Sequence, residues 1–296
     1  MSHAAAVALA FVRPMTDPAK LAPALQAKAP EVRANAAWTA GMLQAPSAML
    51  VPLLRDENME VVRQALIALA HGNGDVDSDS LLRLLHGPTP GIRGAAALAL
   101  AKHQPSIAVE AIPDQLQWEI HSVDGIAKAY AAGGGKTISQ HDIDIVMTSF
   151  RCQMLMIRAL SEIPGNVSAE ALTNLAFQHE GDFAQTDSMV AGFQLWDRAG
   201  AQPDAIVAQL SSPDTVLGDR AEWALVKGDE RVLPAVRQAL TNPAARKRAI
   251  RILAWHGDAA SIPELNNMVH TADPIAALAS WAIMKIRMLQ FAEAAN

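Results

Sequence analysis

Apolar positions return at an interval of thirty residues in the first third of the chain. Val32, Val62 and Ile92 each begin a copy, and further apolar residues follow four and eight positions later. Positions i, i+4 and i+8 lie along one face of an α-helix, so each copy predicts an amphipathic helix with a narrow apolar face. Most of the residues that follow are small enough to let helices approach closely: Ala36, Leu66 and Ala96, then Ala40, Ala70 and Leu100.

The same interval carries an arginine after each of the three apolar positions, at Arg33, Arg63 and Arg93. A fixed period of this length is typical of a solenoid, in which each unit buries its apolar face only by stacking on its neighbours. The pattern therefore predicts an all-α fold, an α-solenoid of stacked antiparallel helix pairs of about 30 residues each.

A second periodic signal, an apolar residue followed by proline, marks the first helix of each pair. Proline is tolerated in the first turn of a helix, where its missing N–H would have no partner, so each such pair predicts a helix start. Glycines that follow helical runs predict left-handed helix ends. The Pro signals are Ala22-Pro23, Val51-Pro52, Ile112-Pro113, Leu233-Pro234 and Ile262-Pro263, and the glycines are Gly72, Gly133, Gly165, Gly200, Gly228 and Gly257.

These signals together predict one solenoid domain over residues 1–296. We expect a capping helix at 3–13 and helix pairs that begin near residues 18, 47, 77, 105, 138, 168, 202, 230 and 260. The centre, around 118–199, is irregular: Val123 and Asp124 replace the arginine motif, and a long second helix is expected over 182–199. Gly133-Gly134-Gly135 interrupts the period and predicts a flexible joint.

Composition narrows the function classes. Hydrophobic residues make up 51% of the chain and aromatic residues 4%, which favours closely packed helices over sheets. The net charge of −6 argues against a general nucleic-acid binder. The single cysteine, Cys152, excludes an internal disulfide framework and is expected to be buried. The apolar run at 4–12 lacks a basic residue before it and a cleavage site after it, so we expect a cytoplasmic protein without a membrane span.

The stretch from Val51 to Leu66 resembles the short HEAT repeats of the phycobilisome-lyase-like group. It has their apolar-Pro pair, a short acidic turn, Val-Arg and an Ala-rich helix. The resemblance implies a ladder in which turn acids meet the arginines. Glu57 with Arg63, and Asp214 with Arg220, fit a spacing of six residues, whereas Arg33 and Arg93 lack the acid. It also implies a possible link to bilin chemistry, which some members of the group perform, although the repeat is a scaffold for different sites.

Motifs for catalysis or metal binding are incomplete. Gly133-Gly134-Gly135-Lys136-Thr137 lacks the first glycine of a phosphate-binding loop, since that position is Tyr130, and a helix rather than a strand precedes it. His141-Asp142 and His179-Glu180 lack the helical spacing that places two metal ligands on one face. No nucleophile, base and orienting group combine, so we predict no catalytic residues, no metal and no cofactor.

Candidate binding residues fall in two places. Trp118 and Trp196 lie in the irregular centre beside His121 and Asp124, and exposed aromatic residues there would be suited to a protein partner. A basic cluster contains Arg246, Lys247, Arg248 and Arg251. It suits an acidic partner, a phosphate-bearing ligand or DNA, or else it is a solvated face that completes the arginine ladder. Tryptophans 38, 223, 255 and 281 are expected to fill gaps between units. The predicted partner-binding residues are Trp118, His121, Asp124, Trp196, Arg246 and Arg248.

The sequence therefore favours a non-enzymatic scaffold or adaptor that binds a protein partner through the concave face formed by the second helices. The alternative is a bilin lyase-like protein, or another cofactor-loading or maturation factor.

Overall fold

A computed structural model describes residues 17–132, 139–163, 167–177, 199–270 and 275–294. The regular elements in these ranges are helices packed in pairs, which confirms the predicted all-α solenoid fold. The chain divides into two compact units, unit 1 (Met1–Ser168) and unit 2 (Ala169–Asn296). Each unit is described by itself below, and one continuous domain over 1–296 stays a prediction.

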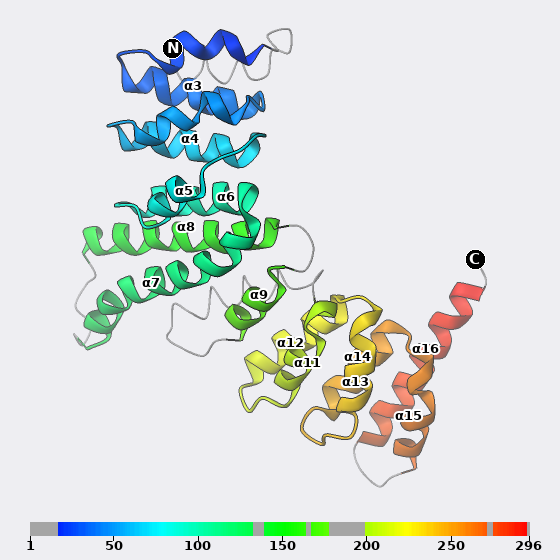
Figure 1. Cartoon of the computed structure of the whole chain (residues 1–296). Coiled ribbons are helices and arrows are strands. Elements are labelled where there is room, and N and C mark those ends of the chain that lie inside the picture. Colours follow the sequence, from blue (N-terminus) through cyan, green and yellow to red (C-terminus); the bar gives the residue numbers. More distant parts are fainter. Residues whose placement is uncertain (1–16, 133–138, 164–166, 178–198, 271–274, 295–296) are drawn as a thin grey trace. The chain divides into compact units, whose positions relative to one another are not determined.

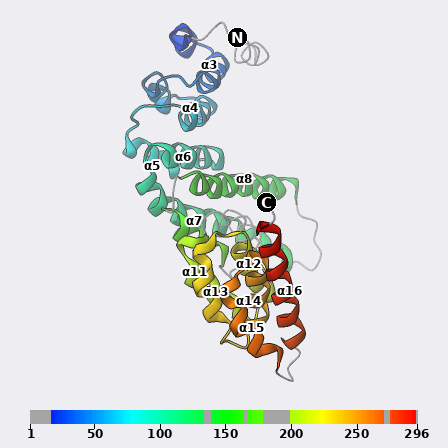
Figure 2. The ribbon, with the colours of Figure 1, turned by 90° about the vertical axis from the view of Figure 1, so that its right-hand side faces the viewer.

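Unit 1 is built on a layer of four stacked helices. Both views show α3, α4, α6 and α8 following one another, and each packs directly on the next (Figures 1 and 2). Shorter helices and α7 cover this layer. The elements are η1 (Pro18–Leu21), α2 (Ala22–Leu25), α3 (Pro30–Met42), η2 (Ser47–Met49), η3 (Val51–Arg55), α4 (Met59–His71), α5 (Ser78–Leu85), α6 (Pro90–His103), α7 (Pro105–Ala132) and α8 (Gln140–Glu162).

Unit 2 repeats the arrangement with α12, α14 and α16 as its second helices. Each packs on its own first helix, α11, α13 or α15, and α14 contacts both α12 and α16. The elements are α9 (Ala169–Ala176), η4 (Ala199–Ala201), α11 (Pro203–Ala208), η5 (Gln209–Ser211), α12 (Thr215–Lys227), η6 (Glu230–Val232), α13 (Leu233–Ala239), α14 (Arg246–His256), η7 (Ala259–Ser261), α15 (Ile262–Val269) and α16 (Ile275–Ala294).

The proline signal locates four of the five helix starts correctly. Pro23, Pro52, Pro234 and Pro263 each lie in the first turn of α2, η3, α13 and α15. The prediction for Pro113 is wrong, because this proline lies inside α7. Contacts of α7 with α8, α6 and α5 keep the run from 105 to 132 helical despite the hydrogen bond that Pro113 removes.

The irregular centre contains one pair of long helices, α7 and α8. Two helix pairs were predicted there, one beginning near residue 105 and one near residue 138. The expected second helix at Val123 is the continuation of α7, and α8 takes the place of a second helix by packing on α6. Helix α8 begins where predicted: Ser139 caps it, accepting a hydrogen bond from the Asp142 N–H at 3.1 Å. The joint at 133–135, the capping helix at 3–13 and nearly all of the helix at 182–199 lie outside the described residues.

The glycines mostly mark the ends of helices, as predicted, but most of those described do not adopt the predicted left-handed conformation. Gly257 ends α14 with φ of 68°, the left-handed conformation expected. Gly72 and Gly228 follow α4 and α12 in extended backbone, so the left-handed prediction is wrong there. Gly200 lies within η4. Gly133 and Gly165 lie outside the described residues.

The small-residue column forms the contacts of the unit 1 layer. Ala36, Leu66 and Ala96 are fully buried, as predicted. Helices α3 and α4 approach closely, since a Cβ added at Gly41 would lie 2.7 Å from the Ala68 Cα. The layer is therefore held at a spacing that additional side-chain volume would disturb.

We expect Ala96→Leu to destabilise the protein, because the added side chain would overpack the contact between α6 and its neighbours. The expected loss is about 1–3 kcal/mol of unfolding free energy. Urea unfolding of the full chain, followed by circular dichroism, measures it. An unchanged unfolding transition would contradict the close packing of Ala96 against the helices beside α6. Val216→Leu, on the exposed surface of α12, is the control.

Candidate functional site

Two arginines of unit 1 join neighbouring helix pairs, as expected if the row is structural. Arg33 on α3 donates two hydrogen bonds of 2.7 Å to the Asp56 carboxylate of the next pair. Arg93 on α6 donates to Glu119 on α7 at 2.7 and 3.1 Å. The hydrogen bonds from Arg33 hold the pKa of Asp56 below its ordinary value. These side chains are therefore committed within the protein.

Glu57, the acid predicted six residues before Arg63, is not the ion-pair partner of Arg63, and the pair of Asp214 with Arg220 stays a prediction. Arg63 pairs with Glu60, one helical turn before it, and not with Glu57. Six residues before Arg33 lies Ala27, whose backbone carbonyl accepts a hydrogen bond from Nη1 at 2.8 Å. A carbonyl is present whatever the residue, which explains why the acid is dispensable. The same contact occurs between Arg93 and Gly87 and between Arg246 and Leu240.

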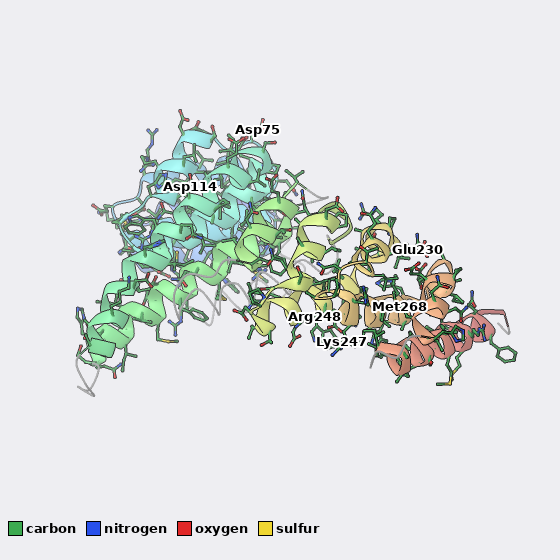
Figure 3. All side chains as sticks on the ribbon, turned by 90° about the horizontal axis from the view of Figure 1, so that it is seen from below. Asp75, Asp114, Glu230, Lys247, Arg248 and Met268 are labelled. Atoms are coloured by element: carbon green, nitrogen blue, oxygen red, sulfur yellow. The ribbon has the colours of Figure 1, made fainter. Side chains whose placement is uncertain are left out.

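The basic cluster at the start of α14 is largely engaged in contacts within unit 2. Arg246 Nε donates to the Leu240 carbonyl at 2.7 Å. Arg248 donates to the Leu210 carbonyl at 3.2 Å and to the Asp219 carboxylate at 2.9 Å. Lys247, which lies next to Arg248 (Figure 3), is exposed. A partner-binding role for Arg246 and Arg248 stays a prediction.

The other predicted site residues lie on α7 in unit 1. The Trp118 side chain is 54% exposed, and the Arg93 guanidinium lies 4.9 Å from its ring centroid, a cation–π distance. His121 is exposed, with Nδ1 donating to the Gln117 carbonyl at 2.7 Å. Asp124 is half-buried. Trp196 lies outside the described residues. Their role in binding stays a prediction.

Two tryptophans that the sequence assigned to gaps between units are exposed instead. Trp223 on α12 is 59% exposed and Trp255 on α14 is 57% exposed, so the gap-filling prediction is wrong for both. Trp281 on α16 is also exposed, and Trp38 is half-buried. The sequence contained a usable signal: Ala221 and Leu225 mark the buried side of α12, and Trp223 lies about 200° around the helix from Ala221.

Trp223 and Trp255 line one groove between α12 and α14. The groove has a volume of about 490 Å³. Its walls combine two indole rings and the aliphatic Val226 with charged groups, a composition common in protein-binding sites. The other lining residues are Asp219, Glu222, Lys227 and Arg251.

The charges around the groove form pairs. Arg251 donates hydrogen bonds to both carboxylate oxygens of Glu222, at 2.6 and 2.5 Å. These hydrogen bonds raise the pKa of Arg251 above its ordinary value. Lys285 Nζ, on α16, lies 3.7 Å from the Trp255 ring centroid. Ion pairs and a cation–π contact thus hold the walls, while much of each indole surface remains open to a ligand.

In the described part of the chain the potential metal ligands are dispersed and the single cysteine is buried. Within it, no three His, Cys, Asp or Glu side chains are grouped so that they could hold a metal ion. Cys152 is buried, as predicted, and burial raises the pKa of its thiol, which keeps it protonated. No helix in the described ranges is long and apolar enough to cross a membrane. The arrangement offers a binding surface.

The stacked helix pairs of each unit define the class of protein, an α-solenoid. In sequence, the HEAT repeats family matches residues 18–101, from η1 into α6. The match confirms the prediction of HEAT repeats for that stretch, and the phycobilisome-lyase-like subtype stays a prediction.

Comparison with solved and curated proteins adds little on function. No curated protein matches the sequence. Among solved structures, one engineered protein has a TM-score of 0.33 at 19% identity and covers 90% of this chain and 77% of its own. A second engineered protein has a TM-score of 0.23 at 19% identity, with coverage of 93% and 98%.

Proposed function

We propose that this protein is a non-enzymatic scaffold that binds a protein partner through the exposed face of its second helices. The observation that carries the proposal is the pair of indole rings, Trp223 and Trp255, exposed in one groove. Tryptophan is the residue type most enriched at energetic centres of protein interfaces, where its large area becomes desolvated.

The geometry of the groove supports a macromolecular partner. The groove lies between α12 and α14, which are second helices of neighbouring pairs. Lys285, which contacts Trp255, extends the surface onto α16. Solenoids bind partners along such rows of equivalent helices. The paired charges of Glu222 and Arg251 at the wall favour a partner with mixed polar groups over a strongly charged polymer.

Truncating both indoles is expected to release the partner while leaving the fold intact. We expect Trp223→Ala with Trp255→Ala to lower partner retention at least about tenfold, since hot-spot truncations each cost more than 1 kcal/mol. Affinity purification of the tagged full chain from its native source, with mass spectrometry of the bound proteins, measures it. Circular dichroism melting checks the fold.

Two further variants locate the site. Met59→Ala, at an exposed residue of α4, is the control and should retain the partner. Trp118→Ala tests the site first predicted on α7. Recovery of the wild-type protein alone at low salt, or equal retention by the double tryptophan variant, would contradict the proposal. The bilin lyase-like alternative stays a prediction, tested by the absorbance change on adding bilin.

A further inference from the structure

Helix α16 has apolar residues on two opposite sides. Ala279, Ala282, Ile283 and Ile286 are buried, on the side that packs against α14 and α15. The opposite side also carries large apolar side chains, and its Phe291, at 78%, is the most exposed large hydrophobic residue of the described chain. This exposed α16 stripe consists of Trp281, Met284, Met288 and Phe291.

A helix that is apolar on both sides is normally covered on both sides. Within unit 2, α14 is covered by α12 on one side and by α16 on the other. Helix α16 is the last second helix of the unit, and in the described residues no further second helix follows it. The α16 stripe lies on the side of α16 opposite its buried face, and an exposed apolar surface of this kind marks an interaction site.

The spacing of the stripe indicates that the occupant is a helix. Residues 281, 284, 288 and 291 follow one another at intervals of three, four and three, the pattern of a helix–helix seam. The seam is about 15 Å long at 1.5 Å per residue. Methionine at its centre adapts to varied apolar side chains, as in helix-binding grooves.

The basic residues beside the α16 stripe favour an occupant that carries acidic residues. Lys285 lies on one edge and Arg287 on the other, and both are basic although the whole chain has a net charge of −6. Arg287 is exposed and lines a shallow groove with Met284, Met288 and Phe291. A second copy of α16 would bring basic edges against basic edges, which is unfavourable, whereas glutamate or aspartate edges would be complementary.

We propose that the α16 stripe docks an amphipathic helix of a partner protein whose apolar seam is flanked by acidic residues. This surface adjoins the Trp223 and Trp255 groove between α12 and α14, because Lys285 contacts the Trp255 ring. Its test uses designed peptides and does not depend on the partner of that groove.

The test uses two designed 21-residue peptides labelled with fluorescein, both with leucine at the seam positions. One has glutamate at every flanking position and the other has lysine. Like charges at the flanks also oppose self-association of each peptide. Fluorescence anisotropy titration with the full chain at low salt is expected to show at least about tenfold tighter binding of the glutamate peptide, and added salt should reduce the difference.

Variants of the full chain assign the binding to the stripe. Met288→Glu should weaken binding of the glutamate peptide at least about tenfold, since it places a charge in the centre of the seam. Arg287→Glu should remove most of the preference for glutamate over lysine. Met59→Glu on α4 is the matched control, and Trp223→Ala should leave peptide binding unchanged. Because Met288 is 67% exposed, its replacement should not alter the melting temperature.

Three outcomes would overturn the proposal. The first is failure of the glutamate peptide to bind at high micromolar protein, and the second is equal binding of the two peptides. In the third outcome, light scattering shows a dimer that Met288→Glu converts to a monomer, which would make a second copy the occupant.

Discussion

Glu119→Gln is expected to destabilise the protein by about 3–5 kcal/mol, the typical cost of removing one partner from a buried ion pair. The Glu119 residue is fully buried and Arg93 is nearly so. The substitution keeps the shape of the side chain but leaves the Arg93 charge without its counter-ion. Because the Arg93 guanidinium is buried, water cannot solvate its charge in place of the lost ion pair.

Glu119 lies where α6, α7 and α8 meet. Its carboxylate connects α7 to Arg93 on α6, and the Ser149 hydroxyl of α8 donates to its backbone carbonyl at 3.3 Å. The Arg93 guanidinium also lies over the Trp118 ring. Loss of the pair should therefore loosen the packing of α6, α7 and α8 together. Urea unfolding of the full chain measures the destabilisation.

Two comparisons separate a buried charge from a general effect of the substitution. Glu162→Gln breaks the ion pair with Arg158 on α8, where both side chains are at least half exposed, and should change stability by less than about 1 kcal/mol. Arg93→Met combined with Glu119→Leu removes both charges and should recover much of the loss. Equal effects of Glu119→Gln and Glu162→Gln would show that the Glu119 pair is not buried in solution.

The repeat architecture could be predicted because its signals are local. The burial of Ala36, Leu66 and Ala96 follows from helical periodicity in a single helix, and prolines such as Pro234 and Pro263 mark helix starts within the next turn. Each signal depends only on residues a few positions away. Thus the expected starts near 18, 47, 77, 202, 230 and 260 agree with the structure to within about two residues, the usual uncertainty of helix boundaries.

The contacts between pairs were harder to predict, because they join residues at variable distances in sequence. Arg33 meets Asp56, 23 residues later, and Arg93 meets Glu119, 26 residues later. A fixed spacing of six therefore could not find these acids. The exposure of Trp223 and Trp255 does not follow from residue type, because large aromatic residues are usually buried. Their position on the helix, opposite the buried side chains, is what indicates it.

The centre of the chain departs from the repeat where local signals conflict. Pro113 and Gly125 both disfavour a helix interior, yet α7 contains both. Packing against α8, α6 and α5 outweighs these preferences. Local propensity alone therefore predicted a break in a segment that tertiary contacts keep helical.

Gly41→Ala is expected to cost about 3 kcal/mol, at the upper end of typical overpacking effects. The added Cβ would lie 2.7 Å from the Ala68 Cα and 2.8 Å from its Cβ, so one helix of the α3–α4 contact must move. Because the nearest atom is backbone, no side-chain rotation relieves the clash. This cost exceeds the helix propensity that alanine gains over glycine, about 1 kcal/mol.

Gly125→Ala provides the matched control with the opposite expected sign. Gly125 lies in the interior of α7, and a Cβ added there would meet no atom within 4 Å. Alanine should therefore stabilise the protein by about 0.5–1 kcal/mol, through its helix propensity alone. Urea unfolding of both variants in parallel measures the two effects. A stabilising effect of Gly41→Ala would contradict the close contact between Gly41 on α3 and the buried Ala68 on α4.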